Sequence, residues 1–79
     1  MVAVINIEIE KRIGQNIRVL REDAGFTQEK LSALLQLNGC DITRSALAKI
    51  EVGQRHIYPD EIILIKELLN VTYDEILKQ

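Results

Sequence analysis

The chain of 79 residues is long enough for one domain, but it is close to the smallest size at which a hydrophobic core suffices without disulfides or metals. Hydrophobic residues make up 47% of it, so a core can form, whereas the lone Cys40 excludes an internal disulfide and a multi-cysteine metal site. The net charge of −2 argues against a strongly basic, non-specific nucleic-acid binder. The single cysteine favours a reducing, cytoplasmic setting. No cofactor is expected.

The first segment, residues 1–7, is apolar and β-branched, and it predicts an extended arm. It is too short to span a membrane and lacks the basic leader and cleavage site of a signal peptide. Because a lone strand is unstable, the arm would pack on the rest of the chain, pair with the stretch around 56–58, or pair with another subunit. These three alternatives remain open at this point.

Aliphatic residues at steps of three or four predict a helix over 8–24, ended by Gly25. Its buried face would hold Ile9, Ile13, Ile17, Leu20 and Ala24. Its outer face would hold Lys11, Arg12, Gln15, Arg18 and Glu22, which we expect to be solvated.

A second helix is predicted over 27–37, with Thr27 as its cap and three leucines on its buried side. Gln28 lies in the first turn, where backbone N–H groups and the helix dipole favour an anion such as a phosphate. Taken alone, Gln28 is more simply interpreted as an exposed residue at a helix start. The following Asn38-Gly39 is a strong turn signal, and the link onward to Thr43 is longer than the three or four residues of a tight helix-turn-helix.

The third predicted helix covers 43–52, with Thr43 as its cap and Gly53 as its stop. Its two faces differ in character, since Leu47 and Ile50 fall with Ala46 on one side. The opposite face is small, cationic and hydrogen-bonding, and it carries Arg44, Ser45, Ala48 and Lys49. Such a face suits the major groove of DNA, although a short amphipathic helix with two outer cations is also common on solvated surfaces.

Two further helices are predicted at the end of the chain. Pro59 fits the first position of a helix over 59–69, and Thr72 opens a capping box for a short helix over 72–78. Charge is unevenly distributed: residues 42–59 carry three basic side chains and one acidic, whereas residues 60–79 carry two basic and five acidic. One end is therefore suited to face phosphate.

With these residues in place, the chain resembles the phage-repressor helix-turn-helix domain, the Cro/C1 or XRE class of bacterial and phage transcription regulators. Three segments in the family's order carry the resemblance, which extends over about 13–77: Ile17 to Ser32, Thr43 to Arg55, and Leu69 to Leu77. It implies an all-α, five-helix domain in which the second and third helices form the motif. Two departures are the lengthened segment 35–41 and Ser32, where the family normally has alanine.

The resemblance also implies site residues. The family's DNA-facing positions correspond to Gln28, Thr43, Arg44, Ser45, Lys49, Gln54 and Arg55. Arg21 and Glu51 correspond to an ion pair that bridges the first and third helices, so Arg21 is left out of the DNA-binding set.

The sequence thus predicts a sequence-specific double-stranded DNA-binding regulator, a repressor, acting as a homodimer on a palindromic operator. The alternative is a protein-interaction or antitoxin-like module that keeps the fold without specific DNA readout. We expect no membrane segment. We also expect no enzyme, because His56 is the single histidine, no nucleophile and base occur together, and there is no glycine-rich phosphate loop.

Overall fold

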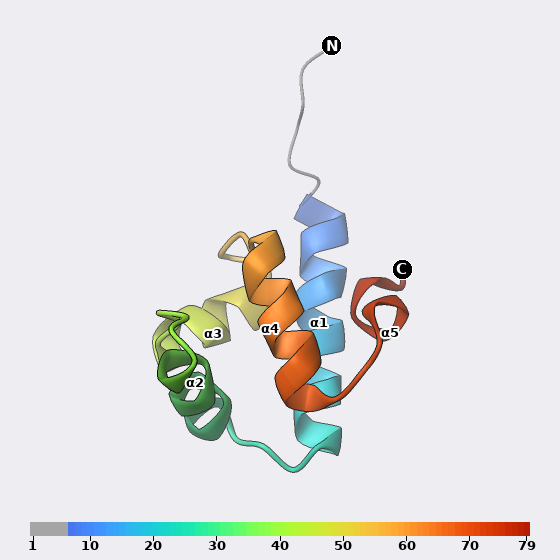
Figure 1. Cartoon of the computed structure of the whole chain (residues 1–79). Helices are drawn as coiled ribbons and strands as arrows, with labels where there is room; N and C mark the ends of the chain where they lie inside the picture. The colour runs from blue at the N-terminus through green and yellow to red at the C-terminus, as the bar shows by residue number, and fades with distance from the viewer. Residues whose placement is uncertain (1–6) are drawn as a thin grey trace.

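The computed structural model describes residues 7–79, which form five helices and no strand (Figure 1). The all-α, five-helix prediction is confirmed. Within these residues, no helix combines the length and hydrophobicity that crossing a membrane would need. The helices are α1 (Ile7–Asp23), α2 (Gln28–Leu37), α3 (Arg44–Glu51), α4 (Pro59–Leu69) and α5 (Tyr73–Leu77).

The predicted extended arm over 1–7 lies outside the described residues, except for its last residue. Ile7 is the first residue of α1, so the prediction is wrong at that position. Glu8 and Glu10 follow in the first turn, where the positive end of the helix dipole favours acidic side chains. This favourable start explains why the helix includes Ile7.

Threonine hydroxyls cap the N-termini of three of the helices. The Oγ1 atoms of Thr27, Thr43 and Thr72 each accept a hydrogen bond from the N–H three residues later, at 3.0, 3.1 and 3.1 Å. Each bond satisfies a backbone donor that the helix itself leaves unpaired, an effect worth about 1 kcal/mol. The helices predicted from sequence at 27–37, 43–52 and 72–78 began at these threonines. In the structure each threonine lies just before its helix, as the cap.

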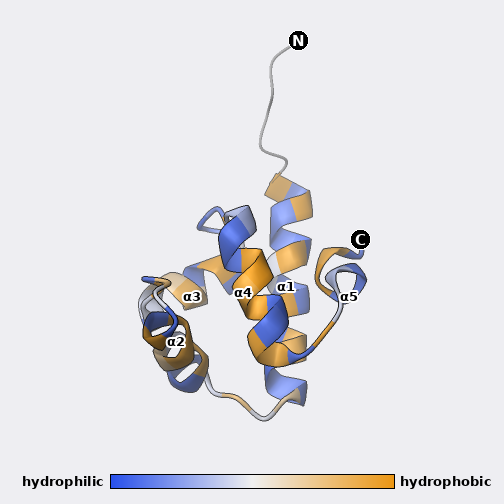
Figure 2. Ribbon diagram, viewed as in Figure 1, coloured by the Kyte–Doolittle hydropathy of each residue, from blue (hydrophilic) through white to orange (hydrophobic). Residues whose placement is uncertain are grey.

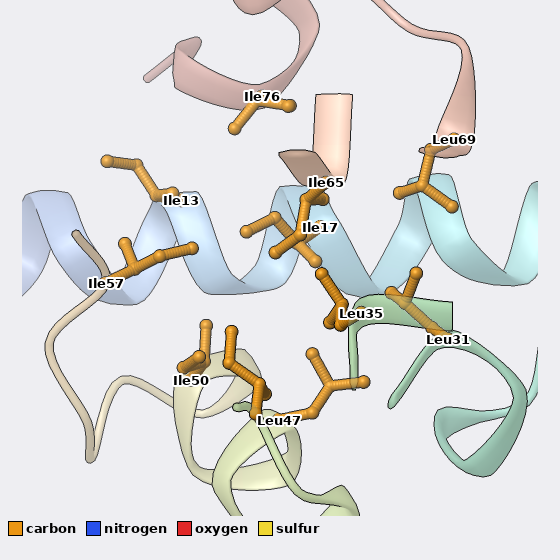
Figure 3. Close-up of a cluster of buried hydrophobic side chains, with 11 residues drawn as sticks. Ile13, Ile17, Leu31, Leu35, Leu47, Ile50, Ile57, Ile65, Leu69 and Ile76 are labelled. Carbon is orange, nitrogen blue, oxygen red and sulfur yellow. The ribbon is translucent and has the colours of Figure 1, made fainter. Parts of the chain in front are cut away.

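Among residues 7–79, the buried hydrophobic side chains of the core are all isoleucine or leucine and come from all five helices (Figure 3). Bands of hydrophobic residues alternate with hydrophilic ones along α1 (Figure 2), as expected for a helix with one face against the core. The core also takes one residue from each connection that flanks α3, which fixes both ends of that helix. The buried set is Ile13, Ile17, Leu31, Leu35, Ile42, Leu47, Ile50, Ile57, Ile65, Leu69 and Ile76.

Gly14 sets the distance between α1 and α3. A Cβ atom on Gly14 would clash with the carbonyl oxygen of Ile50 and would lie 3.0 Å from that of Glu51. Glycine therefore lets the last turn of α3 touch the backbone of α1. This contact holds α3 by its inner side and leaves its outer side uncovered by α1.

Candidate nucleic-acid interface

The outer face of α3 is exposed, as the sequence predicts. Leu47 and Ile50 are buried on the inner face, with exposed fractions of 0% and 1%. Neither of the cationic residues Arg44 and Lys49 forms an ion pair within residues 7–79. The face thus presents two uncompensated cations beside two hydroxyls, and its exposed residues are Thr43, Arg44, Ser45 and Lys49.

The lengthened link between α2 and α3 is ordered by hydrogen bonds at both ends. Gly39 adopts a φ of +82°, which lets the N–H of Cys40 turn back and donate to the carbonyl of Leu35 at 2.9 Å. At the other end, the Ser32 hydroxyl donates to the carbonyl of the fully buried Ile42 at 2.8 Å. Ser32, which stands where the family normally has alanine, therefore anchors the residue just before the Thr43 cap.

A buried ion pair joins α1 to the end of α3. Arg21 Nε and Nη2 donate to Glu51 Oε2 and Oε1 at 2.7 and 3.1 Å, and both residues are at most 6% exposed. Arg21 Nη1 also donates to the carbonyl of Phe26 at 2.7 Å. The hydrogen bonds to Glu51 raise the pKa of Arg21 more than burial lowers it. The pair expected from the family resemblance is present, and the charge of Arg21 is compensated within the protein.

Gln28 is attached to the same carboxylate. Its Nε2 donates to Glu51 Oε1 at 3.0 Å, and the side chain is partly buried. Gln28 is therefore more than an exposed residue at a helix start, because it fixes the first turn of α2 against the end of α3. One amide N–H bonds to Glu51, so a second N–H and the carbonyl oxygen remain for an external group.

A surface hollow of about 610 Å³ lies between α1, α2 and α3. Gln28, Arg44 and Ala48 line this hollow, together with Arg18 from α1. A second hollow of about 510 Å³ shares Gln28, Arg44 and Ala48 and adds Thr43 and Ser45. Four of the predicted site residues therefore lie together: Gln28, Thr43, Arg44 and Ser45.

Arg55 is engaged within the protein. Its Nη1 and Nη2 donate to Glu61 Oε1 and Oε2, both at 3.0 Å, and Nη1 also donates to the carbonyl of His56. The hydrogen bonds to Glu61 raise the pKa of Arg55 more than burial lowers it. Sequence reasoning assigned Arg55 to DNA and missed this partner, since a spacing of six residues across a loop gives no helical signal.

Glu61 is a buried carboxylate at the start of α4, 7% exposed. Burial is the largest single effect on the pKa of this carboxylate, and by itself it would raise that pKa. The hydrogen bonds from Arg55 and from the backbone N–H of Tyr58, at 3.0 Å, together outweigh burial, and the pKa of Glu61 is lowered. The Arg55–Glu61 pair thus closes the connection between α3 and α4 onto the first turn of α4.

The same connection is tied to α1 as well. Glu10 Oε1 lies 2.6 Å from His56 Nδ1 and accepts a 3.3 Å hydrogen bond from the N–H of Ile57. The exposed Gln54 follows the turn at Gly53, and its N–H donates to the carbonyl of Lys49 at 2.8 Å. Gln54 therefore lies in the loop after α3, which is hydrogen-bonded to the end of α3 and to Glu10 of α1.

The matched family agrees with this geometry. A family model described as helix-turn-helix matches residues 17–76, which is most of the chain and includes α2 and α3 complete. The chain belongs to the Cro/C1-type helix-turn-helix family. No curated protein and no solved structure matched it. Members of this Cro/C1-type family are DNA-binding regulators of transcription, and the chain is such a regulator.

Proposed function

We propose that this Cro/C1-type protein binds double-stranded DNA sequence-specifically, as a homodimer on a palindromic operator, and thereby represses transcription. The supporting observation is the outer face of α3, where Arg44, Ser45 and Lys49 are exposed while Leu47 and Ile50 on the inner face are buried. Its side chains are free to enter a groove without any change in the packing of the core.

In the proposed complex, α3 lies in the major groove. The Arg44 guanidinium binds O6 and N7 of a guanine, which is the commonest base-specific contact of an arginine. Ser45 and Thr43 offer hydroxyls that can both donate and accept. Lys49, one turn further along, binds a second guanine edge or a phosphate at the groove wall.

The flanking residues position the protein on the backbone. Gln28 presents its remaining amide atoms to a phosphate or base edge from an orientation fixed by Glu51. Gln54 contacts a phosphate from the loop after α3. For Arg55 the internal pair with Glu61 favours a supporting role, in which it holds this loop in place, over the direct phosphate contact expected from sequence.

Two copies are needed because one module of this size makes few phosphate contacts and binds weakly alone. A two-fold dimer would place its α3 helices in successive major grooves, about 34 Å apart along the duplex or a multiple of that. Such a regulator works where the genome of a bacterium or phage is expressed, so we place it in the cytoplasm.

Selection of binding sites from random double-stranded DNA tests this proposal. We expect one enriched motif with two-fold symmetry, bound more tightly than randomised duplex in anisotropy titrations at low and at moderate salt. If no sequence is enriched and binding is absent or uniform, the proposal fails. The chain would then be better described as a protein-interaction module.

A further inference from the structure

Arg18 lies on the wall of the hollow between α1, α2 and α3 that also contains Gln28 and Arg44. From its position on the outer face of α1, the sequence predicted only a solvated cation. The fold changes that interpretation, because Arg18 lines the same hollow as residues from the first turn of α2 and from α3. Arg18 is thereby grouped with two residues of the candidate interface.

The charges around the hollow favour an anion. Arg21 and Glu51 also line it, but they neutralise each other in a buried ion pair. Arg18 and Arg44 then stand against one carboxylate, that of Glu29. The residues that line the hollow therefore carry an excess of positive charge in a chain whose net charge is −2, and the excess comes from α1 and α3.

The present partner of Arg18 is weakly held. Its Nε lies 3.6 Å from Glu22 Oε2, beyond hydrogen-bonding distance, and the two side chains are 59% and 53% exposed. Exposed pairs of this kind contribute little, whereas an arginine bound to phosphate forms short, charge-assisted hydrogen bonds that can be bidentate. Exchanging Glu22 for a phosphate is therefore favourable for Arg18.

We propose that Arg18 binds a phosphate of the DNA strand that borders the groove entered by α3, an inference that rests on the proposed function. In this arrangement Arg44, from α3, reads a base, while Arg18, from α1, reaches the strand backbone. Arg18 is thus a contact for affinity, and it carries no sequence preference.

The test compares R18A with R12A in the full chain, by anisotropy titration against the selected operator and a randomised duplex over a range of salt concentrations. Arg12 is a matched control because it is exposed on the same helix and lies outside the hollow. Both changes remove one positive charge. For R18A we expect a loss of about tenfold at about 50 mM salt on both duplexes, and a salt slope shallower by about 0.9, with a much smaller change for R12A.

Each result has one meaning. A larger, sequence-independent loss for R18A than for R12A, with the salt slope largely restored in R18K and with unchanged thermal unfolding, supports the inference. Equal losses for R18A and R12A overturn it, and a loss confined to the operator assigns Arg18 to a base instead of a phosphate. A wild-type chain that binds neither duplex overturns the proposed function itself.

Discussion

Arg44 is the residue on which base recognition rests in the proposed complex. It lies in the first turn of α3, exposed and without an ion-pair partner within residues 7–79, and it lines both hollows beside Gln28. Its guanidinium therefore needs no rearrangement of the protein before it meets a guanine edge. Lys49 shares this exposure but lines neither hollow, which suits a contact at the wall of the groove.

For Arg44→Ala we expect a loss of about 1–3 kcal/mol that is concentrated at one base pair of the operator, because a bidentate contact with guanine is removed. The measurement is titration of operators in which each base pair is replaced in turn. Wild-type protein should discriminate at that position and the variant should not. An equal loss on every duplex would instead assign Arg44 to a phosphate.

Glu61 gives the protein a dependence of stability on pH. Because folding lowers the pKa of Glu61 below its ordinary value of 4.5, the unfolded chain takes up the proton first as the pH falls. The stabilisation from this carboxylate is complete above the ordinary pKa and disappears as the pH falls through the lower folded-state pKa. Below that pH, the Arg55–Glu61 pair no longer holds the loop after α3.

Glu61→Gln should lower the free energy of unfolding at neutral pH by about 1–3 kcal/mol and flatten its decline in acid. Urea unfolding across a pH series measures both effects. Asp60→Asn is the matched control, since Asp60 is the exposed neighbour in the same helical turn. The explanation is wrong if Glu61→Gln and wild type lose stability in parallel as the pH falls.

At the scale of elements, the position of α3 depends on contacts at both of its ends. Gly14 lets its last turn touch α1, and the Ser32 hydroxyl anchors Ile42 immediately before its cap. These contacts explain how α3 keeps a defined position although the link before it is longer than that of a tight helix-turn-helix. The extra residues are accommodated in a turn at the end of α2, and the start of α3 stays fixed.

Ser32→Ala tests this anchor, since it leaves the buried carbonyl of Ile42 without the hydroxyl donor. We expect unfolding to be easier by about 1–3 kcal/mol and amide exchange to be faster around residues 40–46. Ser45→Ala, at an exposed position, should change stability by less than about 0.5 kcal/mol. If Ser32→Ala is as stable as wild type, the hydrogen bond does not anchor the link.

The elements themselves were predictable because local chemistry determines them. Threonine caps, glycine stops and aliphatic periodicity are all properties of short segments, so the five helices follow from the residues in order. The pairs between segments were not predictable in this way. Gln28–Glu51 and Ser32–Ile42 depend on how segments far apart in the chain come together, and Arg55–Glu61 depends on the path of the loop between them. Only Arg21–Glu51 was anticipated, through the family resemblance.

At the scale of the whole molecule, the charge distribution places cations around α3 on a chain that is acidic overall. Long-range attraction to DNA is therefore small, and in the proposed complex affinity comes from local contacts and from joining two copies. The exposed hydrophobic residues outside α3 include Ile63 in α4 together with Tyr73 and Leu77 in α5, at the acidic end of the chain.

The whole-molecule prediction concerns stoichiometry. We expect two chains per palindromic operator, with cooperative binding, and much weaker binding to a duplex that carries one half-site. Sedimentation or native mass measurements on the protein with each duplex would determine the ratio. One chain bound with the same affinity to both duplexes would contradict the dimer.

Glu51 gives this regulator an uneven capacity to evolve. A single carboxylate receives hydrogen bonds from Arg21 in α1 and Gln28 in α2 while it belongs to α3. In the proposed complex, operator preference can drift through replacements at Arg44, whose side chain takes no part in that network. Replacements at Gln28 remove the hydrogen bond that attaches α2 to Glu51, so descendants of this protein should diversify at Arg44 far sooner than at Gln28.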